Sequence, residues 1–192
     1  MFDLLITGGR IIDGSGLPWF YADVGITQGK IVDIGRFPHG EAKHRIDATG
    51  HVVAPGFVDA HVHGDLALLA DPYHEPAIRQ GVTTYVIGQD GVAMAPASPT
   101  TLDYMRRYTA GFNGNFPTPG LTWSNVDNYL RCFDDRCALN VCTLVPNGNV
   151  RMDVMGLENR PPTPDELTAM RRMVREGMEQ GAVGLSSGLD YI

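Results

Sequence analysis

The feature that most constrains the fold of this chain is the stretch HVVAPGFVDAHVHGD at residues 51–65. An apolar run ends in a Pro-Gly turn, and a second short run then carries Asp59, His61 and His63 at alternate positions. Successive side chains of a β-strand point to opposite faces, so in a strand these three groups share one face. Burying such a row costs free energy unless a partner compensates, and a divalent metal ion is the usual partner of paired imidazoles. The pattern predicts a metal-binding strand.

The alternative interpretation of His61 and His63 is a hydrogen-bonded pair of histidines, one of them facing solvent. The position of the pair favours the metal interpretation, because parallel α/β folds carry their active sites at the carboxyl ends of strands. The Pro-Gly turn before the run and the Gly64-Asp65 pair after it point the same way.

The composition excludes several classes of partner. The 192 residues are 43% hydrophobic and 19% charged, which is typical of a globular interior and not of disorder. A formal net charge of −7 argues against nucleic acid and against an anionic membrane surface. No apolar run approaches the ~20 residues of a membrane span. The N-terminal MFDLLITGGR lacks the basic region of a secretory signal, so we expect a cytoplasmic protein.

Residues 1–55 predict a small β unit. Short apolar runs flank glycine-containing turns at Thr7–Gly9, at Gln28–Gly29 and around Gly50, which predicts antiparallel pairing. A unit of about 55 residues is marginal alone, so we expect it to pack on something larger.

From residue 56 the pattern changes to strand, loop and helix. The predicted strands cover 56–63, 82–88, 138–145 and 182–186, and the predicted helices cover 75–80, 100–110, 124–133 and the segment that Thr163 begins and Gly181 ends. Strands that alternate with helices imply a parallel sheet or barrel with helices outside. Four such units are half of a (β/α)8 barrel, which takes ~250 residues. We therefore predict an α/β chain in which residues 56–192 form the first half of a TIM-like barrel and belong to a longer protein.

Two of the predicted helices begin with capping signals. Thr163–Glu166 supplies an N-cap, a proline at N1 and a glutamate at N3. Ser124 with Asp127 predicts a variant of the same capping box. Along the helix after Thr163, the spacing predicts four residues that face the core: Leu167, Met170, Val174 and Met178.

Asp90 follows the second predicted barrel strand, in the segment VIGQDGVAMAP. Its carboxylate can reach the same edge of the sheet as the two histidines. The alternative is an Asx turn, because aspartate beside glycine is common in turns. The residues alone leave both interpretations open.

Gly184–Gly188 matches the G-x-S-x-G nucleophile elbow, with Ser186 as the nucleophile. That motif requires a strand before it and a helix after it. A strand is predicted before Ser186, but the sequence ends before any helix, and no histidine follows to complete a triad in the usual order. The pattern favours a structural turn.

Cys132, Cys137 and Cys142 are spaced evenly by five. We expect reduced thiols, because nothing in the sequence indicates export to an oxidising compartment. The alternative is a zinc site, which the position of Cys142 in a predicted buried strand disfavours.

The sequence resembles the metal-dependent amidohydrolase superfamily, and within it the N-acyl-D-amino-acid deacylases, or D-aminoacylases. The resemblance covers essentially the whole chain and rests on these segments: LLITGGRIIDGSG, KIVDIG, APGFVDAHVHGD, QGVTTYVIG, ALNVCTLV and PTPDELTAMRRMVREGMEQGAVGLSSGLDY. It implies a β-sandwich built from both chain ends, with residues 1–55 as its first portion, attached to a distorted (β/α)8 barrel. It also implies one or two divalent ions, usually zinc, that serve the hydrolysis of an N-acyl-D-amino acid.

The resemblance also implies roles for particular residues. His61 and His63 match the metal ligands of the first barrel strand, while Asp59 becomes a supporting group. Asp90 stands where these deacylases commonly have a cysteine ligand, in GQDG instead of GNCG. Carboxylate oxygen also binds zinc, so a site with harder ligands can persist.

Other positions carry over with one departure. In PNGNVR, Asn147 replaces the histidine of a GHG segment, while Arg151 remains. Arg151 and Tyr191 are the implied substrate contacts. The remaining histidine ligands and the catalytic aspartate are expected beyond Ile192, so we predict that these 192 residues alone bind metal weakly and have no hydrolase activity.

Two alternatives stand beside this interpretation. A cyclic-amide hydrolase such as a dihydroorotase or hydantoinase usually carries a carboxylated lysine on the fourth strand, and AVGLSSG has none. The other is an inactive fragment that only binds a partner. The expected partners of the enzyme are a small-molecule amide substrate and the remainder of its own barrel.

Overall fold

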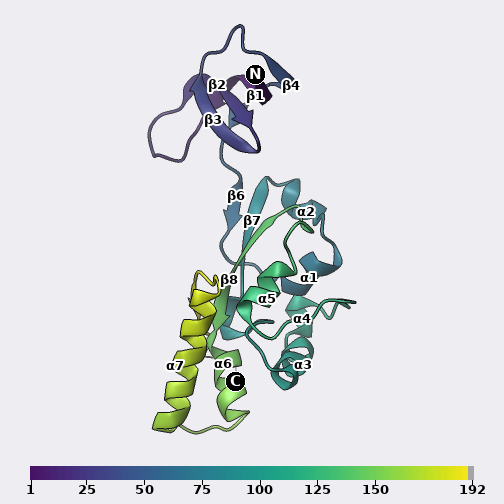
Figure 1. Cartoon of the computed structure of the whole chain (residues 1–192), viewed down its shortest axis with the longest axis vertical. Helices are drawn as coiled ribbons and strands as arrows, with labels where there is room; N and C mark the ends of the chain where they lie inside the picture. The colour runs from purple at the N-terminus through teal and green to yellow at the C-terminus, as the bar shows by residue number, and fades with distance from the viewer. Residues whose placement is uncertain (190–192) are drawn as a thin grey trace. The chain divides into compact units, whose positions relative to one another are not determined.

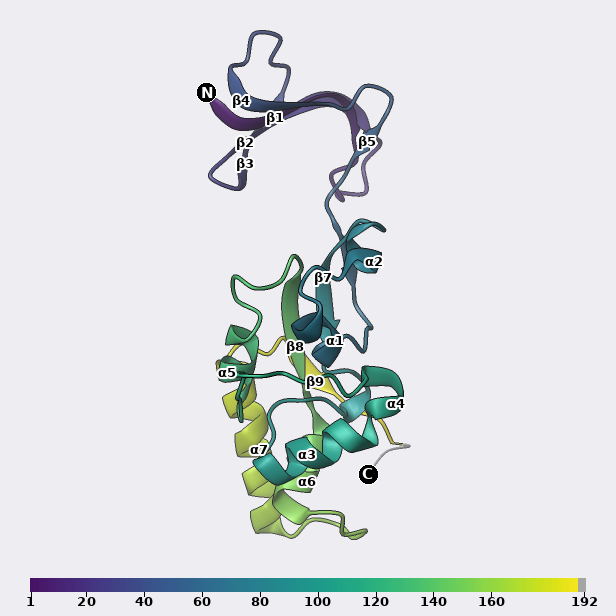
Figure 2. The ribbon, with the colours of Figure 1, turned by 90° about the vertical axis from the view of Figure 1, so that its right-hand side faces the viewer.

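The computed structural model describes residues 1–189, and the chain divides after Pro55 into two units, Met1–Pro55 and Gly56–Ile192 (Figures 1 and 2). Each unit has its own sheet and its own buried cluster. The combination of sheets and helices confirms the predicted mixed α/β class. Among residues 1–189, no helix is long and apolar enough to cross a membrane.

The first unit is a mixed sheet organised around its first strand. Its strands are β1 (Phe2–Ile11), β2 (Phe20–Thr27), β3 (Lys30–Gly35), β4 (Ala42–Asp47) and β5 (Val52–Val53). β2 and β3 pair antiparallel in the hairpin predicted at Gln28–Gly29. β4 and β5 pair parallel with β1, so the prediction of an antiparallel unit is wrong for these two strands. Because β2 occupies one edge of β1, the later segments return along the other edge in the direction of β1.

The hairpin predicted at Thr7–Gly9 is also wrong. β1 runs through both glycines, and its pairing with β2 shifts register between Ile6 and Gly9. Gly8 has a φ of +71°, which glycine adopts without steric cost, so the chain forms a bulge and not a turn. The Gly8 N–H donates to Asp23 Oδ1 at 2.8 Å and fixes the bulge to β2.

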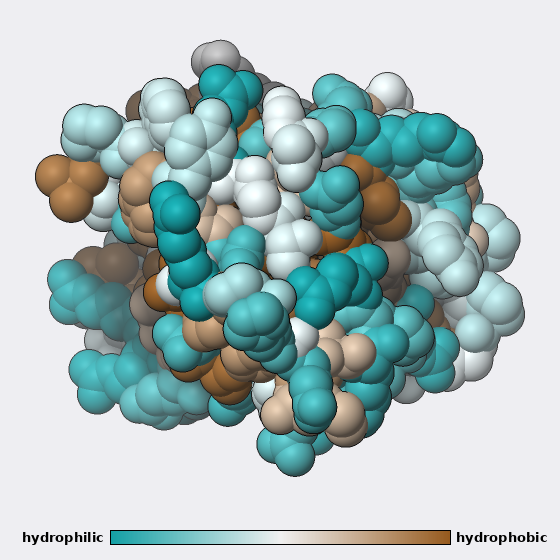
Figure 3. Space-filling model, turned by 90° about the horizontal axis from the view of Figure 1, so that it is seen from above, coloured by the Kyte–Doolittle hydropathy of each residue, from teal (hydrophilic) through white to brown (hydrophobic). Residues whose placement is uncertain are grey.

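The buried cluster of the first unit is small and leaves apolar side chains open to solvent. Its buried members are Ile11, Ala22 and Val24. On β3, by contrast, Ile31 and Val32 are 63% and 55% exposed. Figure 3 shows hydrophobic side chains at the surface between hydrophilic ones. Apolar surface of this kind is typical of a unit that other elements cover.

The second unit is a parallel sheet with helices in its connections (Figure 1). Its strands follow the order β6 (Phe57–Asp59), β7 (Val82–Ile87), β8 (Asn140–Pro146) and β9 (Gly184–Ser186). Its helices are α1 (Asp65–Ala70), α2 (Glu75–Ile78), α3 (Pro99–Tyr108), α4 (Ala110–Asn113), α5 (Val126–Arg131), α6 (Asn147–Met155) and α7 (Pro164–Glu179), with a 3-10 turn, η1 (Gln89–Gly91). Neighbouring strands all pair in parallel, as the alternation of strands and helices predicted.

The strand predicted to run from Gly56 to His63 is shorter than expected. β6 ends at Asp59, whose Oδ1 accepts a hydrogen bond from the His61 N–H at 3.2 Å. A side chain that bonds the backbone two residues ahead turns the chain out of the strand. The two histidines therefore lie in the loop after β6. The prediction that they share one face of a strand with Asp59 is wrong.

Two buried clusters hold the helices of the second unit against its sheet. The larger one joins α1, β7 and α5 through residues that include Leu66, Ile87 and Tyr129, all fully buried. Trp123 lies in the same cluster and donates its indole N–H to the Met94 carbonyl at 2.8 Å. The smaller cluster joins α5, β8, α6 and the segment before β9 through the buried residues Val126, Val145, Val150 and Ala182, and α7 packs against it. Burying side chains of this size stabilises by about 1.5–3 kcal/mol each, so the two clusters set the position of the strand ends.

The capping box predicted at Thr163 is confirmed, but the inward face of α7 differs from the prediction. The Thr163 hydroxyl accepts from the Glu166 N–H, and the Glu166 carboxylate accepts from the Thr163 N–H. The α7 residues that pack on the core are Met170, Met173 and Val174. Leu167 and Met178 are 37% and 42% exposed, so their predicted inward position is wrong. Between Leu167 and Met178, the buried residue of α7 is Gly177.

Two other helix predictions need correction. α5 is capped by Asn125, whose side chain accepts from the Asn128 N–H at 2.9 Å, so Ser124 is not the cap. α6 begins at Asn147 in the segment PNGNVR, for which the sequence predicted no helix. α6 is stable without an amphipathic pattern because several of its faces are buried, and Asn149 donates to the carbonyls of Ala93 and Pro96.

We expect Glu166→Gln to destabilise the protein in a pH-dependent way. The Arg160 guanidinium and the Thr163 N–H, both bonded to the Glu166 carboxylate, lower its pKa from 4.5 to about 2. A carboxyl whose folded pKa is depressed adds stability above its unfolded pKa and loses it as pH falls through the folded pKa. The difference in Tm between wild type and Glu166→Gln should therefore be full above pH 4.5 and shrink toward pH 2.

Thermal melts followed by circular dichroism at these pH values measure the difference. Glu179→Gln is the matched control, because Glu179 is an exposed glutamate at the other end of the same helix. An equal Tm loss in both variants, or a loss that does not change with pH, would contradict the assignment.

Candidate metal centre

The structure brings together the three side chains that the sequence singled out as metal ligands. His61 and His63 lie in the loop after β6, and Asp90 lies in η1 directly after β7. Asp90 Oδ2 is 3.1 Å from His63 Nε2 and 3.4 Å from His61 Nε2. One donor atom from each residue lies within 4.8 Å of the other two. Because β6 and β7 are parallel neighbours, their carboxyl ends deliver all three groups to one edge of the sheet.

The cluster is open to solvent on one side and packed on the other. The His61 side chain is 62% exposed, whereas those of Asp90 and His63 are 33% and 23% exposed. The two imidazole rings meet edge to face, with centroids 5.5 Å apart. Phe112 of α4 packs against the His63 ring at 4.7 Å. A ligand can therefore approach from the His61 side while His63 is held in place.

A left-handed backbone aims the Asp90 carboxylate at the histidines. Gly88, Asp90 and Gly91 have φ values of +81°, +57° and +77°. Glycine adopts such values freely, and aspartate tolerates them better than most residues do. The carboxylate bonds His63, so the structure favours the interpretation that places Asp90 beside the histidines over a simple Asx turn.

Sequence reasoning missed Gln89, which ties the Asp90 turn to the histidine loop. Its side-chain amide is buried and donates to the Ala60 carbonyl at 2.9 Å and to the Val86 carbonyl at 2.7 Å. Ala60 lies between Asp59 and His61, so this contact joins the two loops that carry the cluster. The sequence did offer one signal for a structural role of Gln89, namely its place in a glycine-flanked turn after an apolar strand. The pattern could not show that its side chain bonds Ala60.

Ser186 does not form a nucleophile elbow. It is the last residue of β9 and is 7% exposed. Its hydroxyl donates to the Gly88 carbonyl at 2.5 Å and accepts from the Gly91 N–H at 3.1 Å. A hydroxyl engaged in this way serves the structure of the turn, which agrees with the structural interpretation of the GLSSG segment.

Two acidic residues near the histidines are bound into the structure. Asp59 holds the His61 backbone, as described above, which suits the supporting role that the resemblance implied. Asp65, at the start of α1, is fully buried, and this burial raises its pKa to about 7. The Tyr129 hydroxyl donates to Asp65 at 3.3 Å and opposes that rise. Asp65 thereby links α1 to α5 beneath the histidine loop.

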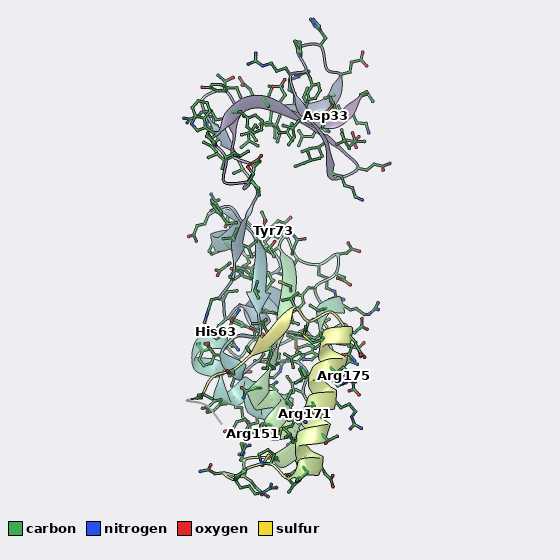
Figure 4. All side chains as sticks on the ribbon, turned by 90° about the vertical axis from the view of Figure 1, so that its left-hand side faces the viewer. Asp33, His63, Tyr73, Arg151, Arg171 and Arg175 are labelled. Atoms are coloured by element: carbon green, nitrogen blue, oxygen red, sulfur yellow. The ribbon has the colours of Figure 1, made fainter. Side chains whose placement is uncertain are left out.

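The structure places Arg151, one of the two predicted substrate residues, apart from the cluster. Arg151 lies on α6, where its Nη2 donates to the carbonyls of Glu158 and Arg160 and so supports the connection to α7. Figure 4 shows Arg151 near Arg171 of α7 and apart from His63. Tyr191 lies outside the described residues. The substrate role of both residues stays a prediction.

The three cysteines are free thiols and lie apart from the candidate site. Burial raises the pKa of each of them. In the part of the chain that the structure describes, the cluster with metal-ligand geometry consists of His61, His63 and Asp90 and includes no cysteine.

Comparison with known proteins places this chain in a family. The model of the Amidohydrolase family matches residues 45–191, which is most of the chain. The chain belongs to the amidohydrolase family. The resemblance inferred from the motifs is therefore confirmed.

Curated relatives and solved structures carry the names of deacylases. A D-aminoacylase of Alcaligenes xylosoxydans xylosoxydans is 36% identical over 195 residues, covering 99% of this amidohydrolase chain and 38% of the relative. The zinc and phosphonate-inhibitor complex of N-acyl-D-glutamate deacylase from Bordetella bronchiseptica superposes with a TM-score of 0.84 at 37% identity, covering 99% of this chain and 39% of that one. A D-aminoacylase with a binuclear metal centre gives a TM-score of 0.80 at 32% identity and coverages of 100% and 40%. The chain thus spans about two fifths of the length of these proteins.

We expect Gly91→Ala to distort the Asp90 turn. A Cβ at this position would meet the Gly188 nitrogen at 2.8 Å and the Asn147 Oδ1, and the φ of +77° would strain any L side chain. Strain of this kind costs about 1–3 kcal/mol, and we expect that loss in the free energy of unfolding measured with urea. Gly111→Ala in α4 is the matched control, because a Cβ there meets nothing within 4 Å. Wild-type stability of Gly91→Ala would show that the turn is not confined.

Proposed function

We propose that this chain forms part of a metal-dependent hydrolase that cleaves the linear amide of N-acyl-D-amino acids into a D-amino acid and a carboxylate. The observation that carries the proposal is the cluster of His61, His63 and Asp90 at the carboxyl ends of β6 and β7. Membership of the amidohydrolase family and 36% identity to a D-aminoacylase support it.

The donor set suits a divalent ion. Zinc in hydrolases takes imidazole nitrogen and carboxylate oxygen, and two imidazoles with one carboxylate gather here within ligand reach. We propose that His61, His63 and Asp90 hold one of one or two divalent ions, with zinc as the first candidate. Bound there, such an ion supplies polarisation of the scissile carbonyl and acidification of a water molecule.

The residues of the chain prepare this site before anything binds. Asp59 and Gln89 fix the backbone of the histidine loop, one from within it and one from the neighbouring turn. The packing of Phe112 on His63 limits the rotation of that ring. Holding ligands in place in advance lowers the free-energy cost of binding. The His61 side chain is exposed, so a small amide substrate can reach the site from that side.

For the substrate we propose contacts from Arg151 and Tyr191. A guanidinium has five N–H donors. In Arg151, Nη2 donates to two backbone carbonyls and Nη1 donates to Met155 Sδ. The N–H groups left over suit the carboxylate that every N-acyl amino acid carries. Tyr191 enters through the resemblance alone.

We propose further that residues 56–192 are the first half of a (β/α)8 barrel and that residues 1–55 are a portion of a β-sandwich. The sequential parallel order from β6 to β9 supports the barrel. A groove beside β9 has an apolar floor made by Val150, Leu167, Met170, Val174 and Leu185, and Asn147 and three arginines also line it. An edge strand beside an apolar groove needs a cover, and we propose the remainder of the barrel as that partner.

We expect the whole protein to lose at least one bound metal ion per chain when His61 and His63 are both replaced by alanine. Loss of supporting partners alone costs about 10–100-fold in metal affinity or activity, so loss of two ligands should exceed that range. Inductively coupled plasma mass spectrometry gives the metal content. A double alanine variant at His39 and His44 is the control, since both are exposed histidines of the first unit. Unchanged metal content in the His61 and His63 variant would refute the ligand assignment.

We expect the whole protein with zinc bound to hydrolyse N-acetyl-D-amino acids in preference to their L enantiomers and to cyclic amides. Release of free amino acid by each member of a substrate panel measures this preference. A chelator should abolish turnover and added zinc should restore it, because the cluster offers metal ligands and Ser186 is engaged in the structure. Faster turnover of a hydantoin or a dihydropyrimidine would identify a cyclic-amide hydrolase instead.

A further inference from the structure

Ser186 joins the two ends of the turn that carries Asp90. Its hydroxyl donates to the carbonyl of Gly88, 98 residues away in sequence, at 2.5 Å. It also accepts from the N–H of Gly91, 95 residues away, at 3.1 Å. A hydroxyl carries one donor and two acceptor positions, so one side chain can satisfy both backbone groups. Ser186 therefore holds the residues that flank Gln89 and Asp90.

The Gly88 carbonyl and the Gly91 N–H, which Ser186 bonds, have no partner in a regular sheet or helix. β7 ends at Ile87, so Gly88 is past the last residue of that strand. With positive φ at Gly88, Asp90 and Gly91, the turn cannot continue the sheet or form an ordinary helix. Buried backbone groups that lack partners cost free energy, and both glycines are buried. The serine hydroxyl is what allows this backbone conformation to be buried.

Close packing confines the turn to one position. A Cβ at Gly88 would meet the Leu144 carbonyl at 2.7 Å, and a Cβ at Gly148 would meet the Gly91 carbonyl at 2.6 Å. β8 and the start of α6 thus press on the turn from one side, while Ser186 bonds it from β9. A displacement of the turn would carry the Asp90 carboxylate away from His61 and His63.

We propose that Ser186 is a positioning residue, which sets the Asp90 carboxylate opposite the two histidines and thereby raises the affinity of the site for a divalent cation. This inference rests on the proposed function, because it takes the His61, His63 and Asp90 cluster as the metal site. Ser186 acts through Asp90 and has no contact of its own with the ion. The contribution of the GLSSG segment is then the positioning of Asp90 from the fourth strand, and Ser186 is not a nucleophile.

The test is the affinity of the whole protein for Co²⁺, measured from its visible absorption, which reports the ligand geometry. Ser186→Ala should weaken Co²⁺ binding by about 10–100-fold, the usual effect of removing a group that orients a ligand. Ser187→Ala is the matched control: it replaces the adjacent, exposed serine and should retain wild-type affinity. Ser186→Thr keeps the hydroxyl and should recover affinity relative to Ser186→Ala.

A second background separates positioning from general destabilisation. Asp90→Asn removes the charged ligand, so adding Ser186→Ala to it should change Co²⁺ affinity no further. Far-ultraviolet circular dichroism establishes the temperature at which each variant is folded, and binding is measured below it. If Ser186→Ala does not fold, Ser186→Cys, which has nearly the same size and a weaker hydrogen bond, takes its place with the same expected direction.

The outcomes distinguish two failures. If Asp90→Asn weakens Co²⁺ binding but Ser186→Ala does not, the metal site stands and the role of Ser186 is overturned. Equal effects of Ser186→Ala in both backgrounds would also overturn it, because the residue would then act independently of Asp90. If neither Asp90→Asn nor the alanine variants of His61 and His63 change Co²⁺ binding, the metal site itself is wrong and the inference falls with it.

Discussion

Gly88, Asp90 and Gly91 hold φ angles of +81°, +57° and +77° in one short turn, and the candidate site depends on that backbone. A turn of this hand points the Asp90 carboxylate back across the end of β6, toward the histidine loop. Local propensity alone does not maintain it, because glycine adopts many other conformations equally well and Asp90 only tolerates this one. Its neighbours maintain it: Gln89 bonds the histidine loop, and Ser186 bonds both glycines from β9. The metal-ligand geometry is therefore a property of the parallel sheet as a whole.

The cluster has the electrostatic character of a cation site. A carboxylate lies 3.1 Å and 3.4 Å from two imidazole nitrogens, and all three groups are partly open to water. Partial exposure leaves these three side chains within reach of an ion from solution. Asp65 shows the contrast: fully enclosed two residues after His63, its carboxyl has a pKa raised to about 7. One short segment thus holds an accessible pair of histidines and an inaccessible acid with a structural role.

The departures from the deacylase motifs have a structural meaning. The resemblance places Asp90 where those proteins commonly have cysteine, and its carboxylate oxygen lies within 4.8 Å of a ring nitrogen of each histidine. A thiolate ligand selects zinc over other divalent ions more strongly than a carboxylate does, so we expect the proposed centre to discriminate less between divalent metals. Asn147 replaces a histidine and begins α6, where its Oδ1 is buried, without a hydrogen-bond partner among residues 1–189, and lies against Gly91. The replacement therefore adjoins the same turn that carries the other substitution.

Sequence patterns predicted the parts of the structure that depend on neighbours in the chain. The alternation of strands and helices after residue 56, the hairpin at Gln28–Gly29 and the capping box of α7 were all predictable, because each rests on periodicity or on contacts within a few residues. The patterns failed where distant packing overrides local preference. β1 runs through a bulge because β2 and β4 pair with it on either side, and α6 forms where no helix was predicted because other elements enclose it.

The sequence by itself determined which chemistry the chain can offer: two imidazoles, a carboxylate in a glycine-flanked turn, and the resemblance that joins them into one site. It placed His61 and His63 on a strand, although they lie in a loop that Asp59 turns out of β6. Only the tertiary structure decided that Asp90 faces them and that Ser186 secures its turn. The physical reason is the range of these contacts, since hydrogen bonds that span 27 to 98 residues exist only once parallel strands have brought their carboxyl ends together.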